Sequence, residues 1–186
     1  GGMVALDWVY RYPYDFKKIV VMNSSSKDTG PVWQRFTLYA TYQFLRALTL
    51  KDPRKREMSI LKMISNLKFE DEATIEMMNK LSSESKLTTA QVGRQLTASS
   101  QFMLPPKIKI PVLILASIKD NLVDVRCSRL MADRLGAQIK FHPTAGHDIS
   151  LDDPDWCIEK LIEFKAFERT EDGPEKVSSR RFETDT

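Results

Sequence analysis

An aspartate and a histidine each follow a short apolar segment in the stretch between residues 109 and 151. We expect residues 110–116 to form a buried strand, Asp120 to follow it, and residues 137–142 to form a second strand that runs into His147. A strand, helix and strand in this order almost always make a right-handed parallel crossover, so both loops leave the same edge of a sheet. Adjacent strands lie about 4.8 Å apart, which brings Asp120 within hydrogen-bonding reach of His147. The sequence therefore predicts two of the three groups of a catalytic triad.

Local signals support this strand–helix–strand unit. Asp124 is a candidate N-cap for the intervening helix, and Gly136 suits a left-handed C-terminal cap. In the second strand, Ile139 and Phe141 alternate onto one side. The helix has one apolar face, formed by Cys127, Leu130, Met131 and Leu135.

The order strand, acid loop, helix, strand and histidine loop, followed by a final helix, resembles the C-terminal half of an α/β-hydrolase. The matching segments are residues 117–123, Ser-Ile-Lys-Asp-Asn-Leu-Val, and residues 145–148, Ala-Gly-His-Asp. The resemblance implies an α/β fold in which three parallel strands with flanking helices carry an inserted helical cap. It also implies a serine hydrolase in which Asp120 orients His147 and His147 takes the proton of the nucleophile. The family's nucleophile turn, Gly-x-Ser-x-Gly, does not occur in these residues.

The first residues, Gly1, Gly2 and Met3, resemble the continuation of that nucleophile turn into a buried helix. The resemblance implies that the chain begins just after the turn, with the nucleophile two positions before Gly1. The donors of the oxyanion hole would then also lie upstream. A start codon at Met3, preceded by two glycines left from an expression vector, is the alternative origin of the same residues.

The distribution of apolar and polar residues divides the chain into four segments. Residues 1–31 hold an apolar helix (3–12), which we expect to be buried on nearly every side, and a strand (17–23). Residues 32–106 show only helical periodicity, and residues 107–167 contain the acid and histidine loops before a helix that starts at Asp153 and Pro154. Residues 168–186 form a polar tail that we expect to be flexible.

The middle segment is interpreted as a helical cap or lid, with helices over residues 33–50, 56–66, 71–81 and 89–103. Its aromatic and methionine side chains are typical of the packed interior between helices of a cap. As part of a hydrolase lid, some of them would instead line an apolar acyl-binding pocket. The basic run at residues 51–56 is interpreted as a solvated turn, and phosphate binding there is the alternative.

Several other polar residues compete for a catalytic role. Ser24, Ser25 and Ser26 fit polar turn chemistry better than an activated nucleophile, because no strained turn or adjacent base accompanies them. His142 lies on the strand itself and is expected to be structural or half exposed. We assign Asp124 to helix capping, Asp148 to local turn hydrogen bonds and Cys127 to a helix interior.

Composition limits the function classes. The net charge is +3 in 186 residues, which gives no argument for nucleic acid as a partner. No apolar run reaches the length of a membrane span, and no metal-ligand spacing or phosphate-binding glycine loop occurs, so we expect neither a metal nor another cofactor. Cys127 and Cys157 fall on expected buried helix faces, which is typical of reduced thiols. Together with the absence of a leader peptide, this favours the cytoplasm.

The leading interpretation is a hydrolase acting on a small, apolar carboxylic ester through Asp120, His147 and an upstream serine. A C–C bond hydrolase, an amidase, a haloperoxidase-like enzyme and a dehalogenase with an aspartate nucleophile share the same motifs. A different class is a catalytically inactive fragment or interaction module. We expect such a chain to pair with the missing N-terminal half or with another copy, since its first strand would lack a neighbour.

Overall fold

Three apolar segments form a parallel sheet in the computed structural model, which describes residues 1–85 and 88–166. The order is β1 (Ile19–Met22), β2 (Val112–Ser117) and β3 (Gln138–His142), with β2 in the centre. All six residues of β2 are buried, as the sequence predicted for a strand covered on both faces. The register pairs Ser117 with His142, so β2 and β3 end together at one edge of the sheet.

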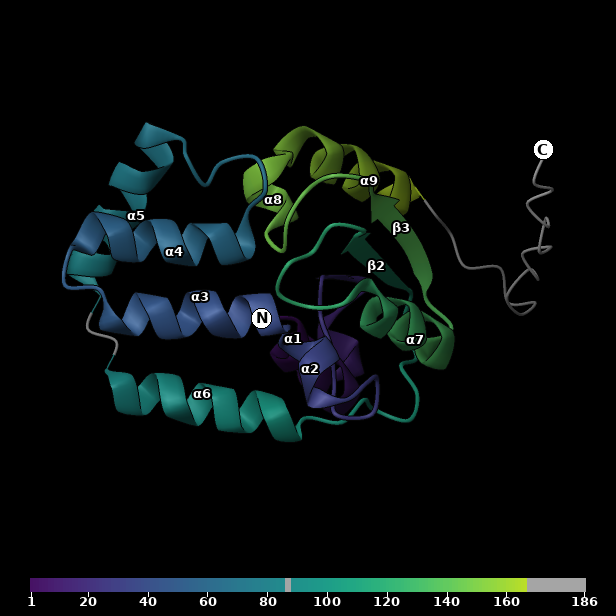
Figure 1. Ribbon diagram of the computed structural model, residues 1–186. Helices are drawn as coiled ribbons and strands as arrows, with labels where there is room; N and C mark the ends of the chain where they lie inside the picture. The colour runs from purple at the N-terminus through teal and green to yellow at the C-terminus, as the bar shows by residue number, and fades with distance from the viewer. Residues whose placement is uncertain (86–87, 167–186) are drawn as a thin grey trace, which may run out of the picture.

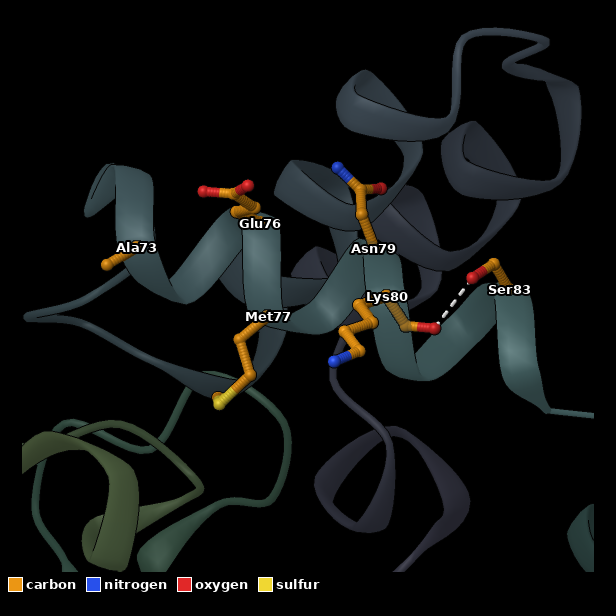
Figure 2. Close-up of a pocket in the computed structure, with 6 residues that line it drawn as sticks. All are labelled: Ala73, Glu76, Met77, Asn79, Lys80 and Ser83. Atoms are coloured by element: carbon orange, nitrogen blue, oxygen red, sulfur yellow. Dashed lines mark hydrogen bonds between the residues drawn. The ribbon is translucent and has the colours of Figure 1, made fainter.

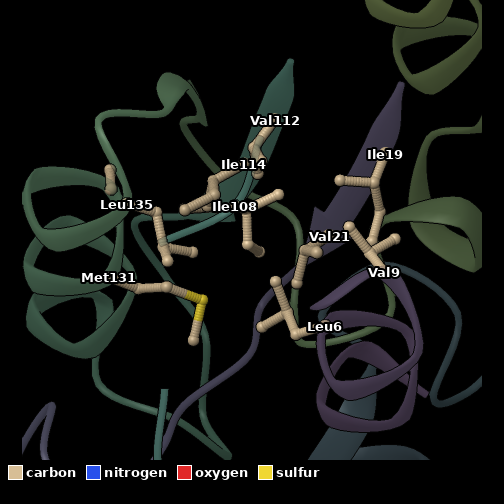
Figure 3. Packing of buried hydrophobic residues seen from close by; sticks show 11 residues of the cluster. Leu6, Val9, Ile19, Val21, Ile108, Val112, Ile114, Met131 and Leu135 are labelled. Atoms are coloured by element: carbon tan, nitrogen blue, oxygen red, sulfur yellow. The ribbon is translucent and has the colours of Figure 1, made fainter. Parts of the chain in front are cut away.

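Helices cover both faces of this sheet (Figure 1). Alternate residues of β2 point to opposite faces, Ile114 into one apolar cluster and Leu115 into another. The helices α1 (Gly2–Arg11) and α7 (Val125–Leu135) pack on the first face. Figure 3 shows Leu6 of α1 and Met131 of α7 in this first cluster. The short α8 (Ile149–Asp152) and α9 (Pro154–Ala166) cover the other face.

The predicted ends of two helices are confirmed. The Asp124 side chain accepts a hydrogen bond from the Arg126 amide at the start of α7. Gly136 ends the same helix at φ 59°, in the left-handed region that glycine adopts without steric cost. Asp153 accepts from the Trp156 amide at the start of α9, where Pro154 occupies the first helical position.

Five helices lie among the described residues between β1 and β2, and we call them the inserted helices. Figure 1 shows α3, α4, α5 and α6 to one side of the sheet. The single helix predicted over residues 33–50 is wrong, because Thr37 accepts from the Ala40 amide and starts a new helix there. Their bounds are α2 (Val32–Arg35), α3 (Leu38–Thr49), α4 (Pro53–Ile64), α5 (Glu72–Glu84) and α6 (Thr89–Gln101).

Burial of α1 on nearly every side was also predicted, and it is not found among the described residues. Leu6 and Val9 are buried against the sheet, but Val4 is 69% and Trp8 51% exposed. A short 3-10 turn at Pro13–Asp15 follows, and the Trp8 indole donates a hydrogen bond to Asp15 there. Only one face of α1 therefore contributes to the core described here.

No helix among residues 1–85 and 88–166 is long and apolar enough to cross a membrane. The polar tail predicted over residues 168–186 lies outside the described residues.

Truncation of the central strand is expected to destabilise the protein. Ile114→Ala should lower the free energy of unfolding by about 2–5 kcal/mol, because the side chain is fully buried and the remaining core cannot fill the space. Ile162→Ala removes the same atoms from a side chain that is 63% exposed, and should change stability by less than about 0.5 kcal/mol. Urea denaturation measures both variants, and equal losses would contradict the described core.

Candidate active site

Asp120 lies in the turn that follows β2. Its Oδ1 accepts hydrogen bonds from the Leu122 amide at 2.7 Å and the Val123 amide at 3.0 Å. Its Oδ2 lies 2.9 Å from Nδ1 of His147. The Asp120 side chain is 2% exposed, whereas the His147 side chain is 26% exposed. The acid is therefore fixed by backbone donors, and the imidazole lies between that acid and solvent.

The contact with Asp120 determines which nitrogen of His147 carries the proton. An ionised carboxylate only accepts hydrogen bonds, so Nδ1 of the neutral imidazole must be the donor. The lone pair then lies on Nε2, and no described residue makes a hydrogen bond to that atom. An imidazole held in this tautomer, with Nε2 open, can act as a general base.

Asn23 holds the loop that carries His147, a role that was not predicted from the sequence. Its Nδ2 donates to the carbonyl oxygens of Gly146, at 3.2 Å, and His147, at 2.7 Å. Its Oδ1 accepts from the Ser117 amide at 2.7 Å. Asn23 has φ 41°, a left-handed conformation that asparagine tolerates better than most residues. An asparagine directly after an apolar strand was the one signal that could have identified it.

His142 supports the same loop from β3. Its Nδ1 accepts from the amides of Thr144, at 3.2 Å, and Ala145, at 2.8 Å, and its Nε2 lies 3.1 Å from Asp153. Nδ1 must therefore be the unprotonated nitrogen, and Nε2 donates to the carboxylate. The predicted structural role fits these bonds, but His142 is buried and not half exposed. The Ser117 hydroxyl also donates to the Ala145 carbonyl in this loop.

The competing acidic residues serve local structure. Asp124 caps α7, and Asp148 caps α8 by accepting from the Leu151 amide. Hydrogen bonds from Arg126 hold the pKa of Asp124 below its usual value. Both residues behave as the sequence predicted.

The competing nucleophiles are buried. Burial raises the pKa of the Cys127 thiol, which disfavours the reactive thiolate. The Ser26 hydroxyl donates to Asp28, and Ser24 and Ser25 are also buried. No hydrogen bond joins any of these side chains to His147 in the described part of the chain.

Two surface hollows lie on the inserted helices. Figure 2 shows the first, along α5, where Glu76, Met77 and Lys80 are among the lining side chains. The second lies between α3 and α4 and includes Arg46 and Lys55. Neither hollow includes Asp120 or His147, so neither is assigned to this pair. Within the described ranges, no group of three or more His, Cys, Asp or Glu side chains could hold a metal ion.

Comparison with known sequences gives a family match. The family model described as serine aminopeptidase, S33, matches residues 1–154, which include the first helix, all three strands, Asp120 and His147. No curated protein matches the chain.

Solved structures of hydrolases share the fold. An α/β-hydrolase, MGS-M2, from a Medee basin deep-sea metagenome library is 21% identical to this chain, with a TM-score of 0.68. The match covers 91% of this chain and 63% of MGS-M2. The 2-hydroxy-6-oxo-6-phenylhexa-2,4-dienoate hydrolase of Rhodococcus sp. strain RHA1 is 21% identical with a TM-score of 0.66, covering 89% and 61%. The esterase RhEst1 of Rhodococcus sp. ECU1013 is 14% identical with a TM-score of 0.63, covering 88% and 61%. The chain spans about three fifths of the length of these structures.

Asp124 gives a pH-dependent prediction. Because its pKa is lowered in the folded state, the charge stabilises the protein above the unfolded pKa of about 3.9, and this contribution is lost as the pH falls. Asp124→Asn keeps a capping side chain but removes the charge. It should cost less than about 1 kcal/mol at neutral pH, since Arg126 is largely exposed, and the cost should shrink below about pH 4.

Urea denaturation at pH 7 and pH 3 measures this difference. Asp133→Asn is the matched control, because Asp133 lies on the same helix and makes no ion pair with a described residue. A cost for Asp124→Asn that grows toward acid pH would contradict the assigned capping charge.

Proposed function

The chain belongs to the serine aminopeptidase S33 family of α/β-hydrolases, and on this premise we propose that the intact protein is a serine hydrolase acting on carboxylic esters. The observation that carries the proposal is the hydrogen bond between Asp120 and His147 at the shared end of β2 and β3. It leaves Nε2 of His147 open to a hydroxyl nucleophile, and we place that serine upstream of Gly1.

The proposed reaction is acyl transfer to water. Nε2 of His147 takes the proton of the serine hydroxyl as its oxygen bonds to the carbonyl carbon of the ester, and the same proton then passes to the departing alcohol. Water attacks the acyl-enzyme in the second half, giving its proton to Nε2, and the acid is released as the serine recovers that proton. Asp120 keeps Nδ1 protonated and stabilises the imidazolium that forms in each step.

The exposed apolar side chains of the inserted helices support the proposal that the part of the substrate next to His147 is an apolar acyl group. The amide of Thr37, just before α3, donates to the Leu122 carbonyl at 3.0 Å, so α3 starts against the acid loop. Leu38, Tyr42 and Leu45 on α3 are largely exposed. We propose that these helices form a lid over the site, with such side chains available to contact an apolar substrate.

A partner surface is also proposed. β1 is an edge strand of the described sheet, and α1 beside it exposes Val4 and Trp8. An unpaired edge next to exposed apolar side chains favours association. We propose that this side binds the N-terminal half of the fold, or a second copy where that half is lacking.

A reducing compartment fits the two thiols. Cys127 and Cys157 are both free and buried, and the pKa of each is raised by burial. Buried free cysteines are ordinary for proteins kept in a reducing environment, which supports the cytoplasm as the proposed location.

Loss of either member of the pair should remove the activity of the intact protein. His147→Ala and Asp120→Asn are expected to lower kcat on p-nitrophenyl esters by a factor on the order of 10⁴, since the base is lost or is held in the wrong tautomer. Labelling by a fluorophosphonate probe should fall with it. Asp124→Asn, in a neighbouring carboxylate that only caps α7, is the matched control and should keep both.

The competing functions give different outcomes. Full labelling of His147→Ala would contradict the proposed base. An intact protein that neither labels nor turns over any acyl ester would favour the inactive interaction module. Turnover confined to aminoacyl anilides or to C–C bonded diketones would keep the mechanism and replace the substrate.

Association of the isolated chain is expected from the β1 edge. A chain of residues 1–186 should elute in gel filtration as a dimer or larger species, because no described residue covers the apolar side chains near that edge. Trp8→Lys should shift the elution toward the monomer, whereas Leu48→Lys, on the inserted helices, should not. A monodisperse monomer of the unsubstituted chain would contradict the proposed surface.

A further inference from the structure

Asn66, in the connection between α4 and α5, contacts both catalytic loops. Its Nδ2 donates to the Lys119 carbonyl at 2.9 Å, one residue before Asp120. The same nitrogen donates to the Thr144 carbonyl at 3.0 Å, in the loop that leads to His147. One side chain of the inserted helical segment therefore bridges the acid loop and the histidine loop.

The chemistry of the partners fixes the orientation of this amide. Both carbonyl oxygens only accept hydrogen bonds, so the NH2 group of Asn66 must face them, and it uses both of its hydrogens there. Its Oδ1 accepts from Nδ2 of Asn121 at 2.7 Å, and Asn121 also belongs to the acid loop. The amide thus has donor and acceptor bonds on both sides, which holds it in one position.

Asp152 forms a second link between the same segments. Its Oδ2 accepts from the amides of Gly146, at 2.6 Å, and Asn66, at 2.9 Å. Its Oδ1 accepts from the Leu67 amide at 3.3 Å and from the Ser65 hydroxyl. The residue is 7% exposed, and no described lysine or arginine pairs with it. Its charge is therefore stabilised by these donors, which join the histidine loop to the inserted segment.

The backbones of the two segments are in direct contact at Gly146. A Cβ atom there would lie 2.7 Å from the Ile64 carbonyl oxygen and 2.9 Å from the Asn66 nitrogen. The Asp148 amide also donates to the same Ile64 oxygen at 2.8 Å. Only a glycine permits this approach, so the hydrogen bonds of Asn66 and Asp152 connect surfaces that already touch.

We propose that Asn66 and Asp152 are positioning residues that hold Asp120 and His147 at hydrogen-bonding distance. The proposal rests on the proposed hydrolase function and extends it, because it places part of the control of the pair in the inserted helices. Asn66 joins the two loops to each other, and Asp152 joins the histidine loop to the segment that presents Asn66. Neither side chain touches the reacting atoms.

Asn66→Ala in the intact protein tests the bridge. We expect kcat on a p-nitrophenyl ester to fall by about 10–100-fold with KM within about twofold, because a small displacement of the base weakens proton transfer without removing substrate contacts. The proton NMR signal of the His147 Nδ1–H, which a hydrogen bond to a carboxylate moves far downfield, should broaden or disappear. Asn79→Ala is the matched control, since Asn79 lies on α5 and its side-chain oxygen has no hydrogen-bond partner among the described residues.

Asp152→Asn and Asn121→Ala extend the test. Asp152→Asn keeps the shape of the side chain but turns an NH2 group toward backbone amides that also donate. We expect it to lower kcat by as much as Asn66→Ala does. The second removes only the bond that orients the Asn66 amide, so it should give a smaller loss of the same kind and stays informative if Asn66→Ala fails to fold. Circular dichroism checks the fold of each variant.

The outcomes separate this inference from the proposed function. Loss of the His147 signal in Asn66→Ala but not in Asn79→Ala supports the bridge even if no ester is turned over, in which case only the hydrolase proposal fails. An active protein whose kcat and His147 signal are unchanged in folded Asn66→Ala and Asn121→Ala would overturn the bridge.

Discussion

The hydrogen bond from Nδ1 of His147 to Oδ2 of Asp120 is the interaction around which the described chain is organised. It requires two strands to end at one edge of the sheet, which the parallel pairing of Ser117 with His142 provides. The connection between the two strands is α7, which is capped by the Asp124 side chain at its start and ended by the left-handed Gly136. The packed core therefore fixes the strand ends from which the acid loop and the histidine loop extend.

A short hydrogen bond between two loops also needs the loops themselves to be fixed. Backbone N–H and C=O groups that are buried in a loop must form hydrogen bonds. In this protein their partners are buried side chains, whereas in a sheet they would be neighbouring strands. Asn23 holds the carbonyls of the histidine loop, His142 holds two of its amides and Asp152 holds a third. Asn66 then joins this loop to the acid loop. The pair is thus positioned from three parts of the chain.

Much of this arrangement follows from sequence because its signals are local. Apolar runs identified the three strands, and Asp124, Gly136 and Pro154 marked helix ends through capping chemistry. The break at Thr37 was missed, since helical periodicity continues across it and only the N-cap geometry reveals it.

Contacts between segments that are distant in the chain could not be predicted from the sequence. The roles of Asn23, Asn66 and Asp152 depend on bonds to residues far away in the chain, and no pattern of neighbours encodes them. The exposed side of α1 is a similar case. Its apolar character predicted burial, but only contacts decide which face is covered, and Val4 and Trp8 remain exposed.

The most direct test of the account is a crystal structure of the intact protein after reaction with a fluorophosphonate. We expect the phosphorus on a serine upstream of Gly1, whose oxygen lies within about 3 Å of Nε2 of His147, with Nδ1 still bonded to Asp120. A labelled serine remote from His147, or an imidazole turned away from Asp120 in that structure, would contradict the central claim.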